Sequence, residues 1–364
     1  MSASRTLLFT TLLASLAALV PGPASAAAGC GVAQGKAVFE TPEVQVYPRR
    51  AKLVACVRAT GRARVVGVRS NDGGIGWSTV DRVIAGRWLL VHTSYTFAES
   101  PDAADDTLID LRTGGSASLS HGGDAGPDGQ VAALPGVLVV TGGDAKGVQA
   151  RFTTGRIERL SAVADATGLA AASSRVYWRE PVGGQADPRT ASYAFTGLPG
   201  ASAERTAPLA AKIGRCVPKR RARLVLHDDT RVVTRTATDL LLCTRTTGLQ
   251  RRVGPAGTKL VALSATALAY TRDGVAGALA LSSSARAEMP APAGAVALDG
   301  TIAAAAADGL RVASVAAPLP KLLTPELVSD VALGVVPADA VALSTVPVAY
   351  WRGADGIDRS VELR

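Results

Sequence analysis

Histidine is the side chain best suited to proton transfer and metal binding near neutral pH, and this sequence has three of them. His92, His121 and His227 are widely spaced, and none belongs to a His-x-x-x-His or similar metal-binding pair. Asp228 and Asp229 follow His227 and offer oxygen ligands to a cation, but this position favours a turn between two strands. The histidine pattern therefore predicts no metal site and no cofactor.

Carboxylates are the second group with catalytic potential, because glycosidases place two of them about 5–10 Å apart across the scissile bond. Asp102, Asp105 and Asp106 share one acidic segment, which we interpret as a solvated loop rather than a catalytic pair. The sequence also lacks the Gly-x-Ser-x-Gly elbow of serine hydrolases and a phosphate-binding Walker loop. No catalytic residue is assigned, and we favour a binding role over an enzymatic one.

The four cysteines repeat one pattern. The spacing from Cys30 to Cys56 is only one position shorter than the spacing from Cys216 to Cys243. The second cysteine of each pair opens a similar string, Cys-Val-Arg-Ala-Thr-Gly in one case and Cys-Thr-Arg-Thr-Thr-Gly in the other. An even cysteine count without the two-to-four-residue spacing of zinc sites predicts disulfides in an oxidising compartment. We predict the bridges Cys30–Cys56 and Cys216–Cys243, each local.

The N-terminus has the pattern of a secretory signal peptide. Arg5 precedes an uncharged apolar run at 7–20, and Ala-Ser-Ala at 24–26 forms a small-x-small cleavage site. We predict that residues 1–26 are removed and that the rest is exported from a bacterial cell as a secreted protein. A second interpretation makes Cys30 an acylated lipoprotein residue, which would leave one cysteine without its partner. No run reaches the roughly 20 apolar residues of a membrane helix, so the chain is not expected to span a membrane.

Basic residues outnumber acidic ones. The formal net charge is +9, and removal of Arg5 with the signal peptide lowers it to +8. The densest basic cluster is Lys-Arg-Arg-Ala-Arg at 219–223, which could hold an acidic polymer by charge, although a solvated face is the simpler interpretation. Aromatic residues make up 4% of the chain and do not interleave with the basic ones, so nucleic-acid binding is not predicted.

The sharpest motif is Ser-Asn-Asp-Gly-Gly-Ile-Gly-Trp at 70–77. It resembles the Asp-box, or BNR repeat, of sialidase-like β-propellers, whose pattern is Ser-x-Asp-x-Gly-x-Thr-Trp. Ser70, Asp72, Gly74 and Trp77 match, and a glycine replaces the usual threonine. In that family the box is a structural hairpin remote from the catalytic centre, and serine and aspartate side chains can satisfy backbone amides in such a turn. The resemblance implies a propeller with a structural hairpin here.

The same resemblance raises a carbohydrate-active, sialidase-like enzyme as an alternative. Such an enzyme needs an arginine cluster for the substrate carboxylate, a Tyr–Glu nucleophilic pair and an acid–base aspartate. No arginine motif of that family stands near the N-terminus, where Val-Tyr-Pro-Arg at 46–49 is only superficially similar. Nothing in the sequence chooses among the candidate tyrosines, which are Tyr47, Tyr95, Tyr177, Tyr193, Tyr270 and Tyr350.

The elements that must position these residues are short apolar runs of four to seven residues, bounded by Gly, Pro, Asp and Ser, which are typical of strands. Their mean spacing is about 42 residues, the period of four-stranded propeller blades. We predict an all-β fold, a single β-propeller-like domain of seven or eight blades over residues 27–364, with tandem β-sandwiches as the alternative. The runs centre near Val54, Leu89, Leu138, Val176, Leu241, Leu268, Ala304 and Val348.

Two near-copies bear on how the repetition is organised. Val-Tyr-Trp-Arg at 176–179 matches Ala-Tyr-Trp-Arg at 349–352, and the offset between these strings is smaller than the offset between the two cysteine strings. One half-by-half duplication does not produce both offsets without insertions or deletions, so we favour repetition of single blades with variable loops. Trp178 and Trp351 could stack on a sugar, but we interpret them as core or rim residues.

Together these observations favour an exported, disulfide-stabilised propeller that binds or scaffolds rather than catalyses. Its partner would be another exported protein or a cell-envelope glycan, met through the loops that connect the blades. The alternatives are the sialidase-like enzyme and a polyanion-binding cell-envelope protein. No particular ligand or oligomeric state is predicted.

Overall fold

The fold is built entirely from β-strands in the part of the chain that the computed structural model describes, as the sequence predicts. Each paired strand runs antiparallel to its neighbour. No helix among these residues has the length and apolarity to cross a membrane. The predicted signal peptide lies outside them. The described residues are 30–32, 36–69, 76–96, 103–122, 129–183, 185, 187–200, 204–209, 211–283, 285–291, 295–337 and 345–363.

The strands of the first half of the described chain form four consecutive groups, which we call units 1 to 4. Unit 1 contains β1 (Phe39–Glu40), β2 (Val44–Arg49), β3 (Lys52–Val57) and β4 (Arg62–Val68). Unit 2 contains β5 (Trp77–Ile84), β6 (Trp88–Tyr95), β7 (Ala103–Asp110) and β8 (Ser116–Gly122). Unit 3 contains β9 (Gln130–Leu134), β10 (Val137–Thr141), β11 (Val148–Phe152) and β12 (Ile157–Ser161). Unit 4 contains β13 (Thr167–Ala172), β14 (Arg175–Glu180) and β15 (Arg189–Ala194).

The second half forms units 5 to 8 in the same way. Unit 5 contains β16 (Ala207–Pro208), β17 (Arg223–His227), β18 (Arg231–Arg235), β19 (Asp239–Thr244) and β20 (Gln250–Pro255). Unit 6 contains β21 (Lys259–Leu263), β22 (Ala267–Arg272), β23 (Val275–Ala280) and β24 (Arg286–Pro290). Unit 7 contains β25 (Val296–Leu298), β26 (Thr301–Ala306), β27 (Gly309–Ser314) and β28 (Lys321–Thr324). Unit 8 contains β29 (Val328–Pro337), β30 (Thr345–Gly353) and β31 (Asp358–Glu362).

The eight apolar runs recognised in the sequence each lie in a different unit, on a strand inside the sheet rather than at its edge. An interior strand such as β10 is buried along its whole length because other sheets cover both of its faces. Its sequence is therefore apolar from Val137 to Val140 instead of alternating. An edge strand such as β12 is largely solvent-accessible and carries charged residues.

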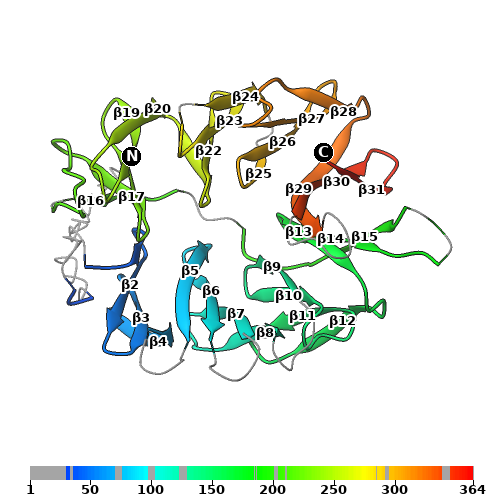
Figure 1. The fold of residues 1–364 in the computed structure, drawn as a ribbon, viewed down its shortest axis with the longest axis horizontal. Helices are drawn as coiled ribbons and strands as arrows, with labels where there is room; N and C mark the ends of the chain where they lie inside the picture. The colour runs from blue at the N-terminus through cyan, green and yellow to red at the C-terminus, as the bar shows by residue number, and fades with distance from the viewer. Residues whose placement is uncertain are drawn as a thin grey trace, which may run out of the picture.

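The units form a ring of two arcs (Figure 1). Units 1, 2, 3 and 4 follow one another along one side, and units 5, 6, 7 and 8 follow one another along the other. Unit 4 packs against unit 8, and unit 1 pairs with unit 5. The arrangement is propeller-like, but its order differs from a propeller in which each blade follows its predecessor around one circle.

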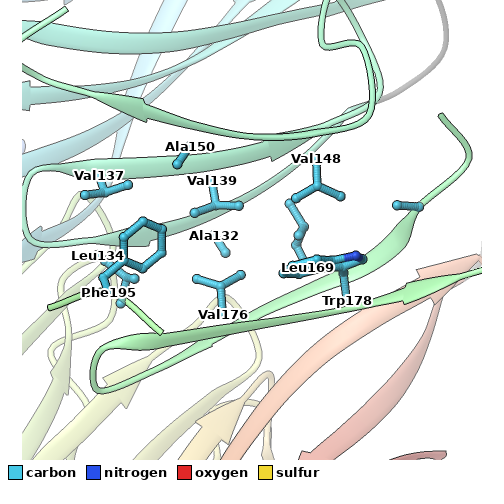
Figure 2. Close-up of a cluster of buried hydrophobic side chains, with 11 residues drawn as sticks. Ala132, Leu134, Val137, Val139, Val148, Ala150, Leu169, Val176, Trp178 and Phe195 are labelled. Carbon is cyan, nitrogen blue, oxygen red and sulfur yellow. The ribbon is translucent and has the colours of Figure 1, made fainter. Parts of the chain in front are cut away.

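Seven of the eight contacts between neighbouring units are hydrophobic cores shared by two sheets. Figure 2 shows the core between units 3 and 4, where Val139 and Val148 face Val176 and Trp178. Burial of side chains of this size contributes roughly 1.5–3 kcal/mol each. Face-to-face packing of small sheets therefore holds most of the ring together.

The eighth contact, between units 1 and 5, contains a buried polar pair, and we call it the seam. Strand β1 pairs with β17 so that these units join into one nine-stranded sheet, with Glu40 opposite His227. Both of these side chains are fully buried. Arg58 also binds the Glu40 carboxylate, so the charge of this buried carboxylate is compensated.

The two matched pairs of sequence strings occupy equivalent places in the two halves. Cys56 and Cys243 lie on β3 and β19 in the first units of each half, and Tyr177 and Tyr350 lie on β14 and β30 in the last units. This equivalence favours two related halves, whereas repetition of single blades stays a prediction from the sequence. The offsets differ partly because unit 2 has strands of 7 or 8 residues, whereas unit 6 has strands of 5 or 6.

Candidate functional site

A cavity of about 1040 Å³ lies where loops and strand ends of six units meet the connection between the two halves. The connection, 195–206, leaves unit 4 at Phe195, which is buried in the core shared with unit 3. It reaches unit 5 at β16, and Leu209 just beyond that strand is buried in a second cluster. The lining segments are 41–43 of unit 1, 82–86 of unit 2, 133–135 of unit 3, 171 and 173–174 of unit 4, 198–200 and 204–205 of the connection, 225–226 of unit 5, and 259–261 and 271 of unit 6.

The cavity lining combines apolar residues with five charged ones, Arg82, Arg205, Lys259, Glu43 and Glu204. Glu43 lies 3.7 Å from the Arg205 guanidinium, which is 71% exposed. Arg82 and Lys259 are exposed. The cavity therefore presents more positive than negative charge.

Glu204 is occupied by its own protein partners. It accepts a hydrogen bond of 2.9 Å from the amide of Leu260 and forms an ion pair with Arg235. This carboxylate holds the connection against units 5 and 6. It consequently contributes to the shape of the cavity rather than offering a free acid.

A second candidate site, which we call the His–Asp–His cluster, lies in unit 2. His92 on β6, Asp106 on β7 and His121 on β8 occupy three adjacent strands. The Asp106 carboxylate lies 2.9 Å from His92 Nδ1 through one oxygen and 3.1 Å from His121 Nε2 through the other. The imidazole centroids are 6.1 Å apart. Nitrogen and oxygen ligands thus converge on one point.

The electrostatics of the His–Asp–His cluster follow from this geometry. Burial alone would raise the pKa of Asp106, but the hydrogen bonds from His121 and His92 lower it to about 2. The hydrogen bond to Asp106 raises the pKa of His92. The cluster therefore keeps Asp106 ionised across the physiological range.

The sequence pattern missed this cluster. Asp105 and Asp106 lie within β7, so the acidic segment is a strand and not the predicted loop, while Asp102 lies outside the described residues. His92 faces Asp106 directly, and His121 is opposite Ala104, two residues before Asp106 on the same face. Only the register of three strands brings these residues together, and the spacing of histidines along the chain carries no sign of it.

Both disulfides are present with the expected local pairing. Cys30 and Cys56 have an S–S distance of 2.04 Å and a Cα–Cα distance of 5.7 Å, and Cys216 and Cys243 have distances of 1.96 Å and 6.0 Å. The first bridge ties the beginning of the described chain to β3, and the second ties the segment before β17 to β19. Each half therefore carries one covalent link of its own.

Of the four matching Asp-box residues, only Trp77 belongs to the described part of the chain, and Ser70, Asp72 and Gly74 lie outside it. Trp77 begins β5 and is 40% exposed, with the Arg69 guanidinium 4.2 Å above its ring. Arg69 and Trp77 form an antiparallel bridge.

The other candidate residues from the sequence lie in a turn, in the hydrophobic cores or on the surface. Asp228 accepts hydrogen bonds of 2.7 Å from the amides of Thr230 and Arg231, as expected for a turn between β17 and β18. Trp178 and Trp351 are buried. The charged side chains of the 219–223 segment are exposed. Of these groups, only the basic segment offers its charges to a partner.

Two tyrosines pair with glutamates. Tyr270 donates to Glu288 from a fully buried position in the core between units 5 and 6. Tyr193 on β15 donates to Glu158 on β12 at 2.9 Å. Burial and the Glu288 contact raise the pKa of Tyr270, and the Glu158 hydrogen bond raises that of Tyr193. Both phenols are therefore held in the protonated form, opposite to what a nucleophile requires.

No protein-family model matches the chain, and no curated protein matches it. Among solved structures, it is similar to a prolyl endopeptidase, with 12% identity over 88% of this chain and 54% of that chain and a TM-score of 0.23. It is similar to apo AztD from Citrobacter koseri, with 11% identity over 86% and 92% of the chains and a TM-score of 0.23. It is also similar to the WD40 domain of SCAP from fission yeast, with 6% identity over 88% and 73% and a TM-score of 0.17. The chain spans about half the length of the endopeptidase. All three TM-scores are below 0.5, and they carry no conclusion about activity.

Proposed function

We propose that this protein is an exported binding protein that holds an acidic, sugar-sized segment of a cell-envelope glycan in its central cavity. The observation that carries the proposal is the convergence of six units and the inter-half connection on one cavity of about 1040 Å³. Small-molecule sites typically enclose about 300–1,000 Å³, with a mostly apolar lining and a few fixed polar groups. The cavity has the size and composition of such a site.

Its charge favours an acidic ligand. Glu204 is engaged by Arg235 and the Leu260 amide. Lys259 and Arg82 are exposed at the lining, and Arg82 also lies 3.3 Å from the exposed carboxylate of Asp81. Like-signed charges in a concave site with low-dielectric walls raise the local concentration of an oppositely charged ligand. A glycan bearing carboxylate or phosphate groups fits this field better than a neutral one.

Export is supported by the two disulfides, because such bridges persist in oxidising environments outside the cytosol. The signal peptide over residues 1–26 remains part of this proposal. The proposed environment is therefore one in which envelope polymers are accessible.

A glycan array containing neutral, uronate-bearing and phosphate-bearing oligosaccharides, followed by calorimetric titration of the best oligosaccharide, tests the proposal. We expect one binding event per chain, with preference for an acidic oligosaccharide. The double variant R82A/K259A should weaken that binding at least about tenfold, since it removes two cations from the cavity.

The matched control is K52A/K321A, which removes the same charge from exposed positions on β3 and β28 outside the cavity lining. It should bind as the parent does. Equal weakening by both double variants would mean that only net charge matters. Absence of any acidic oligosaccharide among the ligands, or no effect of R82A/K259A, would overturn the proposal.

A polyanion-binding surface is the second candidate, and the exposure of the charged residues in the 219–223 segment favours it. In that case K219A/R220A, and not R82A/K259A, would abolish salt-sensitive retention on an anionic resin. The two candidates are thus separated by which pair of cations the binding requires.

The sialidase-like alternative receives less support. Neither Tyr270 nor Tyr193 belongs to the cavity lining, and the pKa of each is raised. We retain the 70–77 string as a proposed Asp-box hairpin with a structural role. A binding protein is accordingly preferred to a glycosidase.

A further inference from the structure

Outside the cavity, the His–Asp–His cluster has the donor set of a transition-metal site. We propose that His92, Asp106 and His121 bind one zinc ion through His92 Nδ1, His121 Nε2 and the Asp106 carboxylate. These three side chains project from the same face of adjacent strands β6, β7 and β8. Side chains held on paired strands are more precisely placed than those on loops.

The distances are close to those that zinc requires. Tetrahedral zinc with ligands at about 2.0–2.1 Å separates its ligand atoms by about 3.3 Å. In the cluster, the carboxylate oxygens lie 2.9 and 3.1 Å from the two ring nitrogens, and all three ligand atoms lie within 4.8 Å of one another. The proposal requires side-chain rotations that bring the two ring nitrogens and one carboxylate oxygen to tetrahedral spacing around the ion.

The donor chemistry selects the metal. Two imidazole nitrogens and one carboxylate oxygen suit zinc and its neighbours in the first transition row. Calcium takes six to eight oxygen ligands and magnesium demands octahedral oxygen coordination. The cluster offers too few oxygens for either, so we assign it to zinc rather than to an alkaline-earth cation.

The charge of Asp106 also favours a cation. Among the described residues, its ion-pair partners are the two histidines and no arginine or lysine. The buried histidine–carboxylate pair at the seam is different, because Arg58 occupies the Glu40 carboxylate. At the seam, the Arg58 guanidinium occupies the position that a metal ion would need. In the His–Asp–His cluster, no guanidinium or ammonium of a described residue pairs with the Asp106 carboxylate, which is therefore available to the ion.

The cluster is also accessible from one side. The side chains of Asp106 and His121 are 15% and 13% exposed, and that of His92 is 43% exposed. Two ligands are therefore fixed in the sheet, and the third faces solvent and can admit the ion. With three protein ligands, water completes the tetrahedron.

The test uses the tag-free exported protein, stripped with a chelator, titrated calorimetrically with zinc chloride and separately with magnesium and calcium chloride. We expect one zinc per chain and no binding of magnesium or calcium at the same concentrations. D106N and H121Q should each weaken zinc binding at least about tenfold. Cobalt substitution should give the visible absorption of a four-coordinate site in the parent and lose it in both variants.

The matched control is D105N, which changes the neighbouring carboxylate on the opposite face of β7, where Asp105 accepts a hydrogen bond of 2.6 Å from Ser120. It should bind zinc as the parent does. Circular dichroism shows whether each variant folds. If D106N or H121Q does not fold, H92A replaces it in the test, because His92 is the most exposed ligand. Absence of zinc binding, or equal affinity in the parent, H92A and D106N, would overturn the assignment.

Discussion

His227 and Glu40 face each other directly across the seam between units 1 and 5, with 2.8 Å between His227 Nε2 and Glu40 Oε2. Both side chains are fully buried. Burial, together with the positive charge of Arg245, lowers the pKa of His227 to about 4. Arg58 already compensates Glu40, so the neutral imidazole donates to the carboxylate without needing a charge of its own.

This pair predicts a loss of stability in mild acid. The pKa of His227 is lower in the folded state than the unfolded value of about 6.5, so the unfolded chain takes up the proton first. The stabilisation that the neutral His227 imidazole gives to the folded state is fully present above about pH 6.5 and is lost as the pH falls towards 4. A shift of this size corresponds to about 3 kcal/mol. Urea unfolding of the parent and of H227Q at pH 7, 5.5 and 4.5 measures it.

H227Q should show a shallower decline than the parent over that interval. The groups around the imidazole are Glu40, Arg58, Arg245, Asp228 and Asp229. Should the parent instead become more stable between pH 6.5 and 4.5, the imidazole would be protonated in the fold, and the neutral pair would be wrong.

Loss of either disulfide should destabilise the protein by about 3–4 kcal/mol, since each bridge closes a loop of 26 or 27 residues in the unfolded chain. C30S/C56S and C216S/C243S, compared with the parent by denaturant unfolding, provide the measurement. Reduction of both bridges in the parent should lower the free energy of unfolding by the sum of the losses in the two double variants. A cross-linked peptide joining the two halves in a non-reducing digest would contradict the local pairing.

The contact between Gly168 and Tyr350 predicts that a side chain at position 168 destabilises the protein and that a second substitution, at position 350, relieves part of this loss. A Cβ at Gly168, whose φ is +72°, would overlap the Tyr350 hydroxyl and lie 3.4 Å from its Cζ. G168A should therefore cost at least about 2 kcal/mol through overlap and backbone strain. Y350F alone should be nearly neutral, because that buried hydroxyl has no hydrogen-bond partner among the described residues.

The double variant G168A/Y350F should recover part of the loss, because it removes the closest atom while the backbone strain remains. Thermal or urea unfolding of the four proteins gives the coupling energy directly. Additive losses would show that the hydroxyl is not the obstacle, and would leave the contact with Val336 Cγ1, 2.9 Å from the added Cβ, and the backbone strain at Gly168.

The proposed Asp-box hairpin predicts that D72A destabilises the protein by about 1–2 kcal/mol, because loss of the carboxylate would leave turn amides without an acceptor. The matched control is D81A, which removes an exposed aspartate from β5. Equal midpoints for D72A and D81A in thermal unfolding would remove the structural role of the motif.

Local features of the fold were predictable because they depend on neighbours in the chain. The runs around Val54 and Leu241 are apolar because each lies on an interior strand, and that property is readable from composition alone. The disulfides were predictable for a similar reason, since each joins a cysteine on a strand of one unit to a cysteine only 26 or 27 residues earlier in the sequence.

The ring order and the His–Asp–His cluster were not predictable, because both depend on contacts between distant segments. No local pattern indicates that β13 of unit 4 packs against β29 of unit 8. His92 and His121 meet at Asp106 only because two successive strand pairings have one particular register, and a shift of one residue would turn a side chain to the other face.

The two-arc order has a topological consequence. A single connection, 195–206, joins the halves, both disulfides close within a half, and one strand pairing, β1 with β17, crosses between them in the described part of the chain. The halves are therefore separable without unthreading: cleavage in the connection would yield two fragments, each with four units and one bridge, whose reassembly would depend on noncovalent complementarity at the seam and at the tyrosine-stacked junction of units 4 and 8.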